Sequence, residues 1–324
     1  MNDGEAARDR RRALAWLLSL VVACALAFVA FKLVRRWRKP PALCITCGDC
    51  PELFRLNPAR KDIGPQGLRD RGYPIPKPPG TRRILILGDS VVYGTGVERE
   101  QTFAKRLETR LGNVEVINSG VPGYSPYNEL QYYRSRGRAF QPDLVLLTVC
   151  FNDVVNPGPH WNGTEHVVDH IPIEAIPNPG RKDRGLGRPP PTIAHGEDRY
   201  PSFLGSETDL TIEVLTNRQS PEWKWLERIY GQLIEAVHAD GAQLAIVITP
   251  LRYQVRLDDY PLDPAAQFLD YCRSQNLSCL DLLPALRRAR PDMLDPFHLD
   301  PHGHEVVAQE LERFLREHPS LLPR

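Results

Sequence analysis

Short apolar runs alternate with amphipathic stretches over residues 83–317, and no other feature of the sequence limits the fold as strongly. The five apolar runs are residues 84–87, 114–117, 143–149, 243–248 and 277–280. Runs of this length without a polar face are typical of strands buried on both sides of a parallel sheet. The amphipathic stretches supply the helices that connect parallel strands through right-handed crossovers. The sequence therefore predicts the α/β class, with a five-stranded parallel sheet covered by helices on both faces.

Five stretches are predicted to be helices: residues 101–111, 125–138, 221–240, 264–274 and 302–317. Gly112 directly follows the first stretch and is expected to end that helix. Ser125 is the expected N-cap of the second helix, because Pro126 follows it at the first helical position.

Two other stretches lack the alternation. Residues 40–80 form a tether and an approach segment, of which residues 56–76 are rich in glycine, proline and charge. We expect this part to be extended on the surface of the domain. Residues 155–220 have little periodicity, and an insert of this length is unusual within a compact domain. The insert is interpreted as a lid, a substrate-binding insertion or a disordered segment.

The N-terminal region has a composition of its own. Residues 13–31 contain no charged side chain, and as a helix they are roughly 28 Å long, enough to cross the apolar core of a bilayer. We predict a single-pass transmembrane helix at residues 13–34, after a basic tail at residues 1–12. A cleaved signal peptide is the alternative, but the run is long and no small-residue cleavage motif precedes the basic residues that follow it. Basic residues on the two sides of the run nearly balance, so they do not fix its orientation.

The charge balance excludes one class of function. The 324 residues carry a formal net charge of +1, and the pI is near 7.7. A surface that binds nucleic acid requires clustered basic residues, which the main part of the chain lacks. We therefore expect no nucleic-acid partner.

The cysteines fall into three groups: Cys24 in the apolar run, Cys44, Cys47 and Cys50 just after it, and Cys150, Cys272 and Cys279 further along the chain. The middle group could ligate zinc or an iron–sulfur cluster only with a fourth ligand, and disulfides or lipid-modified thiols are equally permitted. Cys272 and Cys279 either pair in an oxidising compartment or remain reduced buried thiols. No metal site is predicted.

Small or polar residues follow the first three apolar runs: Ser90, Gly123 and Asn152. The carboxyl ends of parallel strands meet at one edge of a sheet, where such folds bind their ligands. Near the C-terminus, Asp295 precedes His298 by three residues, so its carboxylate can reach back to the imidazole. A serine hydroxyl is a good nucleophile when a base takes its proton and a carboxylate orients that base. The N–H groups of Ser90 and Gly123 and the amide of Asn152 are suitable donors to an oxyanion.

Four blocks of sequence resemble those of the SGNH (GDSL-type) hydrolase family. They are Gly-Asp-Ser at 88–90, Asn-Ser-Gly-Val-Pro-Gly at 118–123, Asn-Asp at 152–153 and Asp-x-x-His at 295–298. The resemblance covers residues 82–315, with the blocks in family order. It implies a flavodoxin-like three-layer α/β/α fold and hydrolysis of carboxylic esters, and some members are thioesterases, carbohydrate acetyl-esterases or acyltransferases. Residues 66–70 also resemble a stretch found ahead of the first block in a membrane-anchored subset.

The resemblance implies a role for each of five residues: Ser90 as nucleophile, His298 as base, Asp295 as the partner that orients it, and Gly123 and Asn152, with the Ser90 amide, as the oxyanion hole. Two positions depart from the family pattern. Cys150 replaces the glycine of the third block, and Val91 replaces the leucine that usually follows the serine. Neither change removes a catalytic group.

Several of these residues also have simpler interpretations. Ser90 on its own reads as a turn serine at the end of a strand. Asp89 is expected to brace its loop as a hydrogen-bond acceptor, and Cys150 to be an ordinary buried thiol. His302 and His304 are expected to be exposed residues at the start of the last helix. The histidines within residues 155–220 have no fixed spacing, and no site demands a cofactor.

The sequence thus predicts a membrane-anchored serine esterase that cleaves an acyl ester of a glycan, a lipid or a small alcohol through an acyl-enzyme. Transfer of the acyl group to a glycan or lipid is an alternative at the same site, and a non-catalytic membrane scaffold is a further one. We expect a hydrolase domain at residues 81–317 on the extracytoplasmic side. It follows a tether at residues 35–80 and precedes a tail at residues 318–324.

Overall fold

The computed structural model describes residues 14, 16–30, 32, 41–47, 50–150, 153, 218–219, 221–256, 265–295 and 297–322. The chain divides into two compact units, Met1–Ala42 and Leu43–Arg324. Of the predicted insert at residues 155–220, only Arg218 and Gln219 fall within the described residues. The interpretation of this insert as a lid, a binding insertion or a disordered segment therefore lies outside them.

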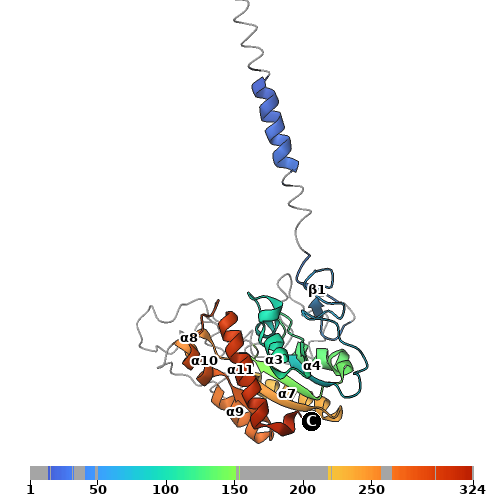
Figure 1. The fold of residues 1–324 in the computed structure, drawn as a ribbon, viewed down its shortest axis with the longest axis vertical. Helices are drawn as coiled ribbons and strands as arrows, with labels where there is room; N and C mark the ends of the chain where they lie inside the picture. Colours follow the sequence, from blue (N-terminus) through green and yellow to red (C-terminus); the bar gives the residue numbers. More distant parts are fainter. Residues whose placement is uncertain are drawn as a thin grey trace, which may run out of the picture. The chain divides into compact units, whose positions relative to one another are not determined.

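The first unit contains a helix that is continuous over residues 16–30, drawn in dark blue in Figure 1. Among the residues that the structure describes, no helix combines the length and the apolar character needed to cross a membrane. The predicted transmembrane helix at residues 13–34, and the single-pass membrane localisation that depended on it, are therefore wrong.

The second unit is built around a five-stranded sheet in the order β4-β3-β5-β6-β7. The strands are β3 (Arg82–Leu87), β4 (Val114–Asn118), β5 (Leu144–Val149), β6 (Gln243–Ile248) and β7 (Ser278–Asp281). Every neighbouring pair is parallel. In chain order this is the arrangement 2-1-3-4-5 of flavodoxin-like folds, in which the chain reverses direction across the sheet beside its first strand. The predicted α/β class and five-stranded parallel sheet are confirmed.

The helices of this unit are α2 (Ser90–Tyr93), α3 (Phe103–Leu111), α4 (Pro126–Ser135), α7 (Pro221–Ala239), α8 (Arg252–Arg256), α9 (Ala265–Ser274), α10 (Leu283–Ala289) and α11 (Pro301–Glu317), with 3-10 turns η1 (Arg99–Gln101), η2 (Gly137–Phe140) and η5 (Pro319–Leu321). Helices α4, α7 and α9 pack on one face of the sheet, and α3, α8, α10 and α11 on the other (Figure 1). The strand residues alternate between the two cores, Leu85 and Leu87 facing one and Ile84 and Ile86 the other. Buried on both faces, the strands need no polar side, which explains their continuous apolar sequences.

The five predicted helices are present with ends shifted by a few residues. Ser125 is the N-cap of α4 and Pro126 its first residue, as predicted. Helix α3 ends at Gly112, whose φ of 70° is unfavourable for other residues. Three short helices, α2, α8 and α10, were not predicted, because segments of four, five and seven residues are too short to show a helical period.

The approach segment differs in part from its prediction. Leu68, Asp70 and Tyr73 are almost fully buried, whereas residues 71–72 and 74–76 are exposed, so the segment lies partly in the core and partly at the surface. The Lys105 ammonium donates to Asp70 Oδ1 at 2.8 Å and to the Tyr73 hydroxyl at 2.7 Å, and Asp70 Oδ2 accepts from the Asn118 N–H at 2.9 Å. A buried carboxylate is tolerated when it is paired and fully hydrogen-bonded in this way. These partners lie far along the chain, so local composition does not reveal them.

Two disulfides resolve part of the cysteine prediction. Cys47 is bonded to Cys50, and Cys272 to Cys279. The first bond follows β1 (Cys44–Thr46), which pairs antiparallel with β2 (Phe54–Leu56) in a separate two-stranded sheet. Cys44 keeps its thiol, and burial raises its pKa to about 11 although the nearby Arg60 charge opposes the shift.

Candidate active site

Ser90 lies where β3 ends, at the first residue of the single-turn helix α2. The Asp89 carboxylate accepts a hydrogen bond from the Val91 N–H at 2.9 Å and caps this helix, so its predicted bracing role is confirmed. At the other end of the turn, the Gly94 N–H donates to the Ser90 carbonyl at 3.1 Å. The main chain on both sides of the serine is therefore fixed by short-range hydrogen bonds.

The second sequence block packs directly against this turn. A Cβ atom at Gly120 would lie 2.2 Å from the Tyr93 nitrogen, so only glycine fits there. The Asn118 side-chain amide donates to the Val92 carbonyl at 2.8 Å, and the Val121 N–H to the Gly88 carbonyl at 3.2 Å. The residues of the second block thus hold the turn that begins with Ser90 from the side of β4.

The His298 ring joins Ser90 to Asp295. Its Nε2 lies 2.8 Å from Ser90 Oγ, and its Nδ1 lies 2.6 Å from Asp295 Oδ2. The second oxygen, Asp295 Oδ1, accepts from the N–H groups of Phe297 and His298, both at 2.9 Å. Partial burial opposes ionisation of Asp295, but the hydrogen bonds from the His298 ring and these two N–H groups outweigh it, so the pKa of Asp295 lies below its usual value. The carboxylate is therefore ionised at neutral pH and lies within hydrogen-bond distance of the imidazole.

The loop that carries Asp295 and His298 is closed at its base. Met293 and Leu299 form an isolated antiparallel bridge, and the Leu294 N–H donates to the His298 carbonyl at 2.9 Å. Helix α11 follows directly, capped by Asp300. A short closed loop before a capped helix has little freedom, which favours one orientation of the ring.

The predicted oxyanion donors are described only in part. Gly123 lies in the turn after β4, with a φ of 87°, next to a hydrogen bond from the Tyr124 N–H to the Val121 carbonyl at 3.0 Å. Asn152 lies outside the described residues. Its neighbours in sequence are joined to each other, since Asp153 Oδ2 accepts from the Cys150 N–H at 2.7 Å and the Asp153 N–H donates to the Cys150 carbonyl at 3.1 Å.

A buried pair of carboxyl groups was not predicted as part of the site. Glu129, on α4, and Asp153 are each 1% exposed. Burial raises the pKa of both well above their usual values, with the Asp89 charge adding to the shift of each and the Glu129 charge to that of Asp153. The sequence signal was available, because Glu129 stands among Pro126, Leu130 and Tyr133, on the apolar face of its helix.

His304 also departs from its prediction. His302 is exposed as expected, but His304 is 1% exposed. Its ring stacks on Phe103 with centroids 5.6 Å apart, and its Nδ1 accepts from the Phe103 N–H at 3.2 Å. Burial, with the charges of Arg106 and Arg69, lowers the pKa of His304 to about 3. This histidine is therefore neutral and joins α11 to α3.

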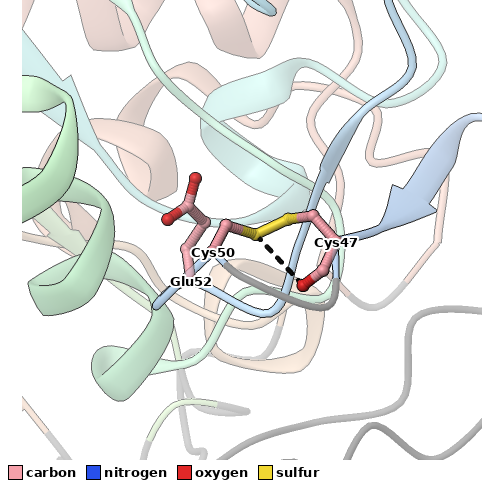
Figure 2. A group of neighbouring side chains, drawn as sticks. All are labelled: Cys47, Cys50 and Glu52. Carbon is pink, nitrogen blue, oxygen red and sulfur yellow. Dashed lines mark hydrogen bonds between the residues drawn. A yellow bond between two sulfur atoms is a disulfide. The ribbon is translucent and has the colours of Figure 1, made fainter.

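One cluster within the described residues has the composition of a metal site: Cys47, Cys50 and Glu52 (Figure 2). The two sulfur atoms are bonded to each other. The fully buried Glu52 carboxylate accepts from Arg136 Nε at 2.7 Å and from the Ser135 hydroxyl at 3.0 Å. The two cysteines are thus used in a disulfide within this segment, and Glu52 attaches the segment to the end of α4. The histidines at residues 160, 166, 170 and 195 lie outside the described residues.

The sequence blocks and the fold agree with a family assignment. The model of the GDSL-like lipase/acylhydrolase family matches residues 86–306, which is more than half of the chain. The chain therefore belongs to the GDSL-like lipase/acylhydrolase family and is an ester-hydrolysing enzyme. None of the curated proteins searched matches it.

The solved structures that match this chain share little sequence with it. A lipolytic protein of the G-D-S-L family from Veillonella parvula is 15% identical, with a TM-score of 0.45, and the match covers 73% of this chain and 100% of that one. The psychrotrophic esterase EstA from Pseudoalteromonas sp. is 14% identical, with a TM-score of 0.44 and coverages of 74% and 99%. A catalytic mutant of an acetylxylan esterase from Geobacillus stearothermophilus is 12% identical, with a TM-score of 0.45 and coverages of 72% and 94%. These values are too low to transfer a substrate.

Replacing Glu129 with glutamine is expected to weaken the pH dependence of the free energy of unfolding. An unfolded glutamate has a pKa of about 4.3. Because the folded pKa of Glu129 is raised, its contribution to stability is fully present below the unfolded value and is lost as the pH rises toward the folded value. Urea unfolding at about pH 5 and about pH 8 should therefore show a smaller loss of stability in Glu129→Gln than in the wild type.

The matched control is Glu100→Gln, which removes an exposed carboxylate from η1. This variant should lose as much stability between the two pH values as the wild type. An equal loss in Glu129→Gln would contradict the raised pKa.

Proposed function

We propose that this enzyme is a serine hydrolase that cleaves carboxylic esters through an acyl-enzyme on Ser90. The observation that carries the proposal is the chain of two short contacts through His298, 2.8 Å to Ser90 Oγ and 2.6 Å to Asp295 Oδ2. A nucleophile, a base and a carboxylate that orients the base form the arrangement that activates a serine hydroxyl.

The acylation step uses the Ser90–His298 contact. Ser90 Oγ attacks the carbonyl carbon of the ester while its proton passes to His298 Nε2. The tetrahedral intermediate collapses as His298 gives this proton to the leaving alkoxide oxygen, and the alcohol departs. In deacylation His298 takes a proton from water, the hydroxide attacks the acyl carbon, and the proton returns to Ser90 Oγ as the acid is released.

Asp295 acts on the imidazole and not on the substrate. With Nδ1–H donating to the carboxylate, Nε2 has its lone pair free for the serine proton. The lowered pKa of Asp295 keeps the negative charge in place when the imidazolium forms. Because the N–H groups of Phe297 and His298 hold the other carboxylate oxygen, the carboxylate does not need to reorganise during the reaction.

The negative charge on the carbonyl oxygen requires its own donors. We assign this role to the Ser90 and Gly123 N–H groups and the Asn152 side-chain amide. The assignment is supported by the position of Ser90 and Gly123 at the ends of the neighbouring strands β3 and β4. Asp89 and Asp153, each one residue from a proposed oxyanion donor, accept hydrogen bonds from nearby main-chain N–H groups.

Replacing Ser90 with alanine tests the proposal. Without the hydroxyl no acyl-enzyme forms, so hydrolysis of a short-chain aryl acetate by the full-length protein should fall to the uncatalysed rate. Ser274→Ala is the matched control, since the Ser274 hydroxyl contacts the Tyr271 carbonyl of its own helix and the side-chain amide of the adjacent Gln275, and its loss should leave kcat unchanged. Wild-type turnover in Ser90→Ala would contradict the proposal, whereas an acylated sugar or lipid among the wild-type products would indicate acyl transfer by the same serine.

A second variant, Asn152→Ala, tests the proposed oxyanion hole. Loss of one donor to the oxyanion is expected to lower kcat by on the order of 10²–10³ with little change in KM, because the bond strengthens only in the transition state. Steady-state kinetics on the same aryl acetate measure both constants. A kcat equal to that of the wild type would remove Asn152 from the mechanism.

A further inference from the structure

A buried arginine that lies outside the residues matched by the family model contacts the turn that begins with Ser90. Arg69 precedes residues 86–306 in the chain and is 8% exposed. Its Nη1 donates to the carbonyls of Tyr93 at 3.0 Å and Gly94 at 2.8 Å, and its Nη2 donates to the carbonyl of Val97 at 2.6 Å. The guanidinium carbon also lies 4.6 Å from the centre of the Tyr93 ring. One planar cation thus holds three main-chain carbonyls, as the rigid fork of a guanidinium allows.

Two of these carbonyls, those of Tyr93 and Gly94, belong to the turn that begins with Ser90 and its cap, and that of Val97 lies in the loop that follows. Helix α2 has only four residues, so its last carbonyls have no helical partner and its geometry depends on outside contacts. The Gly94 and Thr95 N–H groups both donate to the Ser90 carbonyl at 3.1 Å. Fixing the end of this turn therefore also fixes its first residue, and a positive charge at a helix C-terminus is favourable.

The same loop supports the segment that carries the base. Gly96, with a φ of 86°, lies so close to Leu294 that an added Cβ would be 2.3 Å from Leu294 Cδ1. Leu294 directly precedes Asp295, and its N–H donates to the His298 carbonyl. A shift of the loop between Gly94 and Val97 would therefore act on the base as well as on the nucleophile.

Arg69 is itself held firmly. The next residue, Asp70, accepts from the Asn118 N–H in β4 and from the Lys105 ammonium in α3, and it is 2% exposed. Leu68, on the other side, is 1% exposed. The main chain at Arg69 is thus attached to β4 and α3, and the side chain extends from there to the turn that begins with Ser90.

We propose that Arg69 is a positioning residue that sets the distance between Ser90 Oγ and His298 Nε2. The approach segment then contributes to the active site, although it precedes the residues that the family model matches. This inference rests on the proposed function, because it assigns Arg69 a role through Ser90 and His298. Misplacement of reacting groups by about 1 Å can lower the rate by on the order of 10², so the effect should appear in kcat.

The test compares Arg69→Ala with Arg83→Ala in the full-length protein. Arg83 is an equally suitable buried arginine, 0% exposed, with hydrogen bonds to the Phe140 carbonyl and the Glu115 carboxylate. It lies at the start of β3, at the opposite end of the strand from Ser90. Both variants lose a buried guanidinium, so both should unfold at lower urea concentration, but only one loses contact with the site.

We expect kcat for an aryl acetate to fall by about 10² in Arg69→Ala with KM nearly unchanged, and to stay near the wild-type value in Arg83→Ala. Guanidinium ion, added well below denaturing concentration, should raise kcat of Arg69→Ala in a saturable manner and leave Arg83→Ala unaffected. Equal kcat losses in the two variants, at conditions where both are folded, would overturn the inference.

If Arg69→Ala does not fold, Arg69→Lys tests the role of Arg69 instead. An ammonium group cannot hold three carbonyls in one plane, so this variant should lose kcat by about 10-fold without a change in KM. Wild-type kcat in Arg69→Lys would then overturn the inference. Ser90→Ala is measured in parallel to separate the two proposals. Activity in Ser90→Ala would reject the proposed function. If Ser90→Ala is inactive and Arg69→Lys is fully active, only the role of Arg69 is rejected.

Discussion

The hydrogen bond between Ser90 and His298 is the contact on which the rest of the site depends. It joins residues 208 positions apart, so no local structure can form it. The parallel sheet brings Ser90 to the carboxyl edge of β3, and the closed loop before α11 brings His298 to the same edge. Asp295 then fixes the ring from its far side at 2.6 Å. The turn that begins with Ser90 and the loop that carries His298 each have hydrogen bonds of their own, so the contact joins two segments that are already held in place.

Many of the polar side chains near this contact are buried, and burying a polar side chain costs free energy. Asp89 is a buried cap, Glu129 and Asp153 are buried carboxyls with raised pKa values, and Arg69 is a buried cation with carbonyl partners. In a low dielectric medium each of these groups interacts more strongly with its neighbours than it would in water. Such groups rarely help stability by themselves, but Asp89, Asp153 and Arg69 hydrogen-bond main-chain groups and so restrain the main chain around them.

Features that depend on local sequence pattern were predicted from the sequence, whereas a feature that depends on contacts between residues far apart in the chain was not. The five strands and the Ser90–His298–Asp295 set follow from apolar runs and short motifs, whereas the burial of Asp70 in the approach segment depends on Lys105, which no local pattern connects to Asp70. His304 was mistaken for an exposed residue, although its spacing to buried Val307, Ala308 and Leu311 places it on the apolar face of α11. The membrane prediction relied on the absence of charge, and none of the helices that the structure describes is long and apolar enough to cross a membrane.

The most direct measurement is the site and rate of covalent modification by a fluorophosphonate, which reacts with a serine hydroxyl only when a neighbouring base activates it. Peptide mapping by mass spectrometry should locate one adduct on Ser90 of the wild-type protein. His298→Ala, folded but without the base, should react far more slowly. An adduct on another residue, or equal rates in the wild type and His298→Ala, would contradict the account that His298 activates Ser90.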